Sequence, residues 1–132
     1  MSTNLAARHG VIMWIDHHEA RIFDVQEGAF DEAKVRASDR HVHRHPKGGT
    51  AEHNHPDDAQ RFFHEVAATL EGTEQLLIVG PSNAKLEFFR YLHRHAAKLE
   101  PKVVGLETVD HPTDGQLIAY GKRHFGIPER RV

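Results

Sequence analysis

Two short segments in which every residue is apolar constrain the fold more than any other feature of this chain. They are residues 11–15 (Val-Ile-Met-Trp-Ile) and residues 76–79 (Leu-Leu-Ile-Val). A strand with one wet face alternates apolar and polar side chains, whereas a strand that is apolar on both sides needs cover on both faces. The two segments therefore predict central strands of a sheet that has helices on both faces.

Three further strands are expected around this pair. Residues 20–25 follow the first segment closely enough to form an antiparallel hairpin with it, and residues 16–19 supply the turn. A third strand is expected from about Glu32, because Ala33, Val35 and Ala37 alternate with charged side chains. That alternation predicts an edge strand with one wet face. A fifth strand is expected over residues 103–109.

Three helices are predicted from apolar residues that recur with helical spacing. The first begins at about Asp57 and ends before Gly72, the second follows the junction at residues 80–83, and the third opens after residues 110–114. We expect the tail at residues 126–132 to be frayed. The three apolar stripes are Ala59, Phe62, Phe63, Val66, Ala67 and Leu70; Phe88, Phe89, Leu92, Ala96 and Leu99; and Leu117, Ile118, Gly121 and Phe125.

The order of these elements is βββαβαβα, an antiparallel meander followed by two right-handed crossovers. With the apolar strands in the middle, the predicted fold is α/β, a mixed five-stranded sheet in the order 3-2-1-4-5. This is the layout of ribonuclease H-like domains. A chain of 132 residues suits one domain, and we expect residues 1–132 to form a single domain with an ordered core at about residues 10–125.

The composition excludes several classes of function. Because the chain has no cysteine, disulfides, thiolate zinc sites and cysteine nucleophiles are ruled out. No run of about 18 apolar residues occurs, and the first ten residues lack the apolar centre of a signal peptide, so we expect a soluble cytoplasmic protein with no membrane partner. The formal net charge of -2 provides no overall basic field, so any contact with RNA must come from a local patch.

Such a patch is predicted in the loop after the third strand. Lys34 and Arg36 precede the loop, and its glycines allow a close approach of the backbone to RNA phosphates. The alternative is a solvated edge strand whose charges prevent edge-to-edge pairing. The candidate RNA-binding residues are Arg40, Arg44, His45, Lys47, Gly48, Gly49 and Thr50.

The same region is rich in histidine, of which the chain has thirteen. Three alternate along the expected strand and two follow in the loop, with Glu52, Asp57 and Asp58 close in sequence. Imidazole and carboxylate ligands suit a divalent transition metal such as zinc, nickel or copper. A polar surface without metal gives the same pattern, and no other cofactor is expected. The candidate metal ligands are His41, His43, His45, His53 and His55.

A third candidate site is the junction at residues 80–85, at the carboxyl end of a central strand and the start of a helix. Free backbone N–H groups there favour anions, and Ser82, Asn83 and Lys85 are the candidate anion-binding residues. The alternative is a junction capped by Ser82 or Asn83, with Lys85 paired or extended to solvent. The spacing is not that of a P-loop.

Carboxylates near the strand ends raise the further possibility of nuclease chemistry, in which acidic residues hold magnesium. Asp16 and Glu19, with His17 and His18 between them, are sufficiently explained by a turn. Asp24 and Asp110 do not complete an evident metal-binding set with Asp16.

Three stretches resemble a bacterial family related to the middle domain of class I peptide-chain release factors and Pelota. They are GVIMWIDHHEARIFDV, LLIVGPSNAKLEFFRYL and VDHPTDGQLIAYGKRHF, and the resemblance covers most of residues 10–125. The most distinctive parts are the junction at residues 80–85 and the loop after the third strand. The resemblance implies the sheet of translational-machinery domains, in agreement with the predicted strand order.

In the release factors, the loop after the third strand carries a Gly-Gly-Gln motif that helps to hydrolyse peptidyl-tRNA. Here Gly48 and Gly49 match the motif, whereas Thr50 replaces the glutamine. The resemblance therefore implies a non-enzymatic module that contacts ribosome or tRNA through this loop, as in Pelota, which works in ribosome rescue without the motif. The alternative is a metal-assisted hydrolase acting on an ester or phosphodiester. The oligomeric state is left open.

Overall fold

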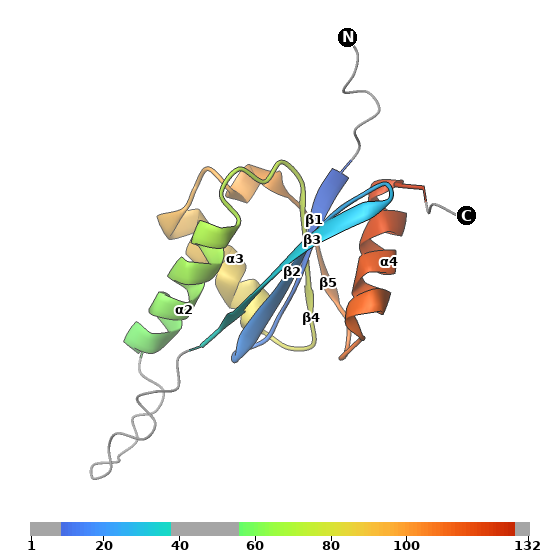
Figure 1. Cartoon of the computed structure of the whole chain (residues 1–132). Helices are drawn as coiled ribbons and strands as arrows, with labels where there is room; N and C mark the ends of the chain where they lie inside the picture. Colours follow the sequence, from blue (N-terminus) through green and yellow to red (C-terminus); the bar gives the residue numbers. More distant parts are fainter. Residues whose placement is uncertain (1–8, 38–55, 129–132) are drawn as a thin grey trace.

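The computed structural model describes residues 9–37 and 56–128, and its centre is a mixed five-stranded sheet (Figure 1). The strands lie in the order β3-β2-β1-β4-β5, as the sequence predicts. β1 pairs antiparallel with β2 and parallel with β4. The elements are β1 (His9–Ile15), β2 (Glu19–Gln26), β3 (Ala29–Arg36), α2 (Pro56–Thr69), β4 (Leu76–Gly80), α3 (Ala84–His95), the 3-10 helix η3 (Glu100–Lys102), β5 (Val103–Thr108) and α4 (Asp114–Phe125).

Two tight turns set the register of the meander. The Asp16 carboxylate accepts hydrogen bonds from the backbone N–H groups of His18 and Glu19, at 2.8 and 2.9 Å, and so closes the turn between β1 and β2. Gly28 has φ +79° in the turn between β2 and β3. That turn places Ala29 opposite Gln26, so β3 begins three residues before the expected start at Glu32.

Helices cover both faces of the sheet, with α2 and α3 on one face and α4 on the other (Figure 1). Because β1 and β4 lie between these layers, both strands are buried along almost their whole length. The core under α2 and α3 includes Met13, Ile78, Phe63 and Phe88, among others. A smaller core under α4 is built from Ile12, Trp14, Phe23, Val25, Leu77, Val79, Leu117 and Ile127.

The helix stripes differ from the prediction at their ends. Ala59 is exposed, so the stripe of α2 that packs on the sheet begins at Phe62. Helix α3 ends at His95, and Leu99 packs against the same core from the segment that follows the helix. The apolar pattern therefore continues beyond the end of the helix, because a residue after the last helical turn can still pack against the core.

The expectation of a frayed tail is wrong for its first residues. Gly126 has φ +69° and ends α4 in the left-handed conformation that glycine adopts most easily. The next residue, Ile127, is 4% exposed and donates its backbone N–H to the Lys122 carbonyl at 2.8 Å. Ile127 thus packs into the smaller core under α4 and does not extend into solvent.

No helix within residues 9–37 and 56–128 is long and apolar enough to cross a membrane.

Candidate functional site

The loop that the sequence singles out lies outside the described residues. This applies to the RNA-binding candidates Arg40, Arg44, His45, Lys47, Gly48, Gly49 and Thr50, and to the metal candidates His41, His43, His45, His53 and His55. The structure does place the point from which the chain enters this segment. The Ala37 backbone N–H donates to the His18 carbonyl at 2.8 Å, so β3 ends beside the turn that follows β1.

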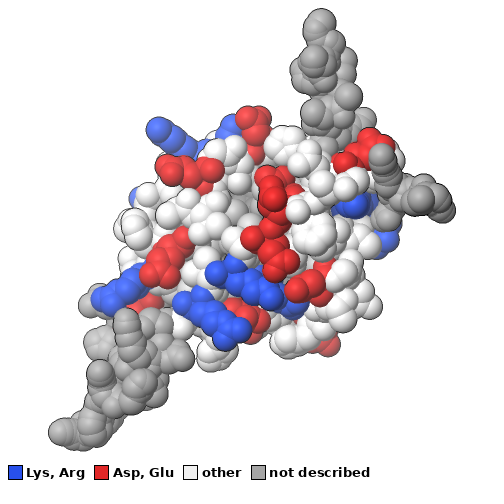
Figure 2. Space-filling model, in the orientation of Figure 1, with Lys and Arg blue, Asp and Glu red and all other residues white. Residues whose placement is uncertain are grey.

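Three cations from β2 and β3 lie near that point. Arg21 and Lys34 are directly opposite each other in the β2–β3 ladder. Arg36, near the end of β3, has a side chain that is 73% exposed and lies 3.8 Å from the Glu19 carboxylate. Figure 2 shows Lys and Arg side chains over this part of the sheet, interleaved with acidic side chains. We call Arg21, Lys34 and Arg36 the strand cations.

Asp114, at the start of α4, holds two of the strand cations together. Its carboxylate lies 2.7 Å from the Arg21 guanidinium and 3.6 Å from the Lys34 ammonium. The hydrogen bond from Arg21 lowers the pKa of Asp114 below its ordinary value, and the charges of Lys34 and Arg21 act in the same direction against the opposing effect of burial. Two cations can thus remain adjacent in the sheet because an anion from another element lies between them.

Arg21 also ties β2 to the segment that leads into α4. Its guanidinium donates to the Pro112 carbonyl at 3.1 Å and lies 4.6 Å from the centre of the Trp14 ring. The indole N–H of Trp14 donates to the Asp110 carbonyl at 2.7 Å. A capping box at Thr113 and Gln116 then starts α4. This end of the helix is therefore anchored by polar contacts to β1 and β2.

At the predicted anion site, Lys85 lies on the buried side of α3, with 7% of the residue exposed. Its ammonium donates to the Ser82 carbonyl at 2.7 Å. Asn83 is the N-cap of α3 but makes no capping hydrogen bond with its side chain. The junction is therefore held by Lys85 on a backbone carbonyl and not by a side-chain cap from Asn83, and the anion site of Ser82, Asn83 and Lys85 stays a prediction.

The acidic residues considered for nuclease chemistry do not gather. Asp24 lies opposite Val11 in the β1–β2 ladder, toward the end of β1 that is remote from Asp16, and 3.5 Å from His9. Asp110 follows β5, and its side chain is 94% exposed. Within residues 9–37 and 56–128, no group of three or more histidine, aspartate or glutamate side chains could hold a metal ion.

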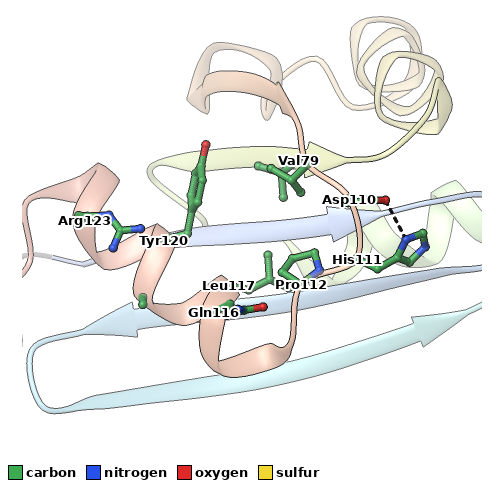
Figure 3. Close-up of a pocket in the computed structure, with 10 residues that line it drawn as sticks. Val79, Asp110, His111, Pro112, Gln116, Leu117, Tyr120 and Arg123 are labelled. Carbon is green, nitrogen blue, oxygen red and sulfur yellow. Dashed lines mark hydrogen bonds and ion pairs between the residues drawn. The ribbon is translucent and has the colours of Figure 1, made fainter.

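A groove beside α4 is a site that the sequence reasoning missed (Figure 3). Its volume is about 690 Å³. One wall is the stripe Gln116, Tyr120 and Arg123 of α4, the other is the segment after β5, and the groove is mainly apolar. The spacing i, i+4 and i+7 of that stripe is visible in the sequence. Only the fold, however, shows that this stripe lines a groove on the side of α4 that faces β5.

At one side of the groove the Tyr120 hydroxyl donates a short hydrogen bond to the Glu107 carboxylate of β5. This hydrogen bond raises the pKa of Tyr120 above its ordinary value, and burial and the charge of Glu107 add to the effect. The contact joins α4 to the edge strand and fixes the position of the tyrosine ring.

Solved structures with a similar arrangement of elements include two Pelota proteins and an archaeal translation termination factor. Pelota from Archaeoglobus fulgidus matches 89% of this chain with a TM-score of 0.61 and 21% sequence identity. Pelota from Thermoplasma acidophilum matches 89% with a TM-score of 0.62 and 17% identity. The archaeal translation termination factor aRF1 matches 86% with a TM-score of 0.53 and 16% identity. This chain shares its fold with part of each.

The match covers 31%, 32% and 33% of these three proteins, so this chain spans about a third of their length. No family model matches the sequence. No curated protein matches it either. The likeness is therefore one of fold, carried by structures at low sequence identity.

Proposed function

We propose that this domain is a non-enzymatic, translation-associated module that binds ribosome or tRNA through the loop after β3. The observation that carries the proposal is the shared fold with Pelota and the translation termination factor aRF1 over 86–89% of the chain. Fold alone does not fix function. The charge pattern around the loop supplies the second line of support.

The sequence adds further cations soon after those of β3. Arg40, Arg44 and Lys47 lie in the segment that the chain enters directly after Arg36 and Ala37. Arg21 and Lys34 are paired with Asp114 and Arg36 lies 3.8 Å from Glu19, and Arg36, with its side chain 73% exposed, is the strand cation most accessible to a phosphate. Phosphate contacts from lysine and arginine supply most of the affinity of non-specific nucleic-acid binding, so a local patch suffices despite a net charge of -2. Gly48 and Gly49 permit a close approach of the backbone to RNA.

The test is sedimentation of the native protein with ribosomes, and filter binding to bulk tRNA, at several salt concentrations. Replacing Arg44 and Lys47 together with alanine should weaken association. Each lost phosphate contact removes one counterion-release contribution, so the slope of log affinity against log salt should fall in magnitude by roughly 1.4–1.8. The melting temperature should change little, because neither residue belongs to a predicted apolar stripe.

A matched control removes the same charge elsewhere. Arg94 and Lys98 are exposed near the end of α3, and α3 runs away from the sheet edge at which β3 ends (Figure 1). Their double alanine variant should keep the native salt slope. An unchanged slope and affinity in the Arg44 and Lys47 variant would remove the loop from the proposal. No ribosome or tRNA association by the native protein would remove the proposal itself.

A further inference from the structure

We propose that the groove beside α4 binds a small amphipathic carboxylate, with the apolar body of the ligand in the groove and its carboxylate on Arg123. The groove of about 690 Å³ lies within the size range of small-molecule sites. The proposal concerns a different surface from the loop after β3, and it does not depend on the proposed function.

The shape of the groove follows from the position of α4. This helix packs over β1 and β2, and within residues 9–37 and 56–128 no second helix covers β4 and β5 on that face (Figure 1). Val79 and Leu117, both buried, close the bottom, and Pro112 lies in the wall across from α4 (Figure 3). Val109 also lines the groove. These side chains offer an apolar ligand dispersion contacts and few hydrogen-bond partners.

Arg123 lies at the rim of the groove, and its guanidinium has no carboxylate partner among the described residues. In Figure 3 the Arg123 guanidinium turns toward Tyr120, at the side of the groove. Among residues 9–37 and 56–128, no carboxylate lies within ion-pair distance of Arg123. A guanidinium presents a planar fork of donors that matches a carboxylate, which gives the ligand a preferred charge and orientation.

The two acidic side chains near the groove are already engaged. Glu107 accepts the hydrogen bond from Tyr120. Asp110 lies 3.2 Å from His111, and its side chain is 94% exposed. Both carboxylates keep their negative charge, so the preference for a carboxylate ligand rests on direct pairing with the guanidinium fork of Arg123 and not on the net charge around the groove.

A nucleotide fits this lining less well. A base carries several hydrogen-bonding groups, and Val79, Val109, Leu117 and Pro112 would leave those groups unsatisfied on burial. A phenyl or alkyl group has no hydrogen-bonding atoms, so its burial leaves none unsatisfied. The lining thus favours an apolar carboxylate, and the nucleotide becomes a competing outcome of the test.

The test uses four probes with the full-length protein: 4-phenylbutyrate, 4-phenylbutan-1-ol, 4-phenylbutylamine and adenosine monophosphate. Amide chemical shifts report binding, and the Trp14 indole N–H, which donates to Asp110 at the groove, serves as a local reporter. We expect saturable shifts at residues 109–123, with 4-phenylbutyrate roughly threefold to tenfold tighter than the alcohol and tighter still than the amine.

The variant Arg123→Gln should bind the acid and the alcohol equally. Lys122→Gln is the matched control, because it removes one positive charge from the same last turn of α4 without lining the groove. It should keep the native preference. Equal binding of the three phenyl probes by the native protein, absence of saturable shifts at the groove, or tighter binding of adenosine monophosphate would each overturn the proposal. Loss of the preference in both variants would also overturn it.

Discussion

On one face of the sheet α2 and α3 close a large apolar core, whereas on the other, in the part of the chain that the structure describes, α4 is the one helix that covers β1 and β2, and it leaves a groove beside β4 and β5. The first face packs aromatic rings, such as those of Phe63 and Phe88, with centroids 5.4 Å apart. The second face has a smaller apolar core and adds directed polar contacts, such as that between Arg21 and Asp114. Burial is non-directional and fills a layer, whereas hydrogen bonds position a single helix and leave room next to it.

The largest effect should come from emptying the aromatic core. We expect Phe63→Ala to destabilise the fold by roughly 3–5 kcal/mol, because it removes a buried ring that lies among Phe62, Phe88 and Tyr91. Chemical denaturation measures the change. Phe30→Ala is the control, since Phe30 is 46% exposed and its loss should cost less than about 1 kcal/mol. Equal losses in the two variants would contradict the assignment of the core.

An intermediate effect should come from the contact between α4 and β1. In a helix, alanine is favoured over glycine by about 1 kcal/mol. At Gly121, however, an added Cβ would lie 2.8 Å from Cγ2 of the buried Ile12. Gly121→Ala should therefore destabilise the protein, by about 1–3 kcal/mol.

Gly115→Ala separates crowding from helix propensity, because an added Cβ there meets no atom closer than 4.0 Å. This control should leave stability unchanged or raise it by up to about 1 kcal/mol. If Gly121→Ala also raised the melting temperature, α4 would not pack on β1 as closely as described.

The smallest effect should come from the polar anchor on the second face. The lowered pKa of Asp114 means that its carboxylate contributes stability above the ordinary pKa of 3.8, and that this contribution is lost as the pH falls through the lowered value. Asp114→Asn should cost about 1 kcal/mol or less at pH 7, because the side chain is 39% exposed and solvent screens the pair. The difference from the native protein should shrink as the pH falls below 3.8.

Thermal unfolding at pH 7 and at about pH 3 measures this difference. Asp31→Asn provides a comparison, because no cation among the described residues lies within ion-pair distance of the exposed Asp31. A gap between Asp114→Asn and the native protein that stayed constant over this pH range would show that the Arg21 contact does not depend on the carboxylate charge.

Much of the fold could be predicted from the sequence because burial leaves a periodic trace. Residues 11–15 and 76–79 are apolar on both sides, and both segments lie in buried central strands. Errors arose at element ends. The start of β3 is set by a turn at Gly28 rather than by alternation, and Ile127 is buried beyond the end of its helix. Periodicity reports a regular element but not where the chain turns.

The candidate site was less accessible to sequence reasoning. Local composition indicated the loop at residues 44–50 and the junction at Lys85, and the structure locates Lys85 on the buried side. The amino-acid sequence gave no sign that Asp114 lies between Arg21 and Lys34, or that Arg123 lies beside a groove. These relations join residues that are distant in the chain, and no local spacing encodes them.

The amino-acid sequence by itself determined the class of fold, the order of the strands and the absence of cysteine chemistry, since these depend on residue type and local periodicity. Only the tertiary structure decided that α4 lies over β1 and β2 and leaves a groove beside β5. The apolar stripe of a helix determines which side of the helix is buried. The lateral position of the helix on the sheet is determined by contacts between residues distant in the chain, such as Gly121 with Ile12 and Arg21 with Asp114.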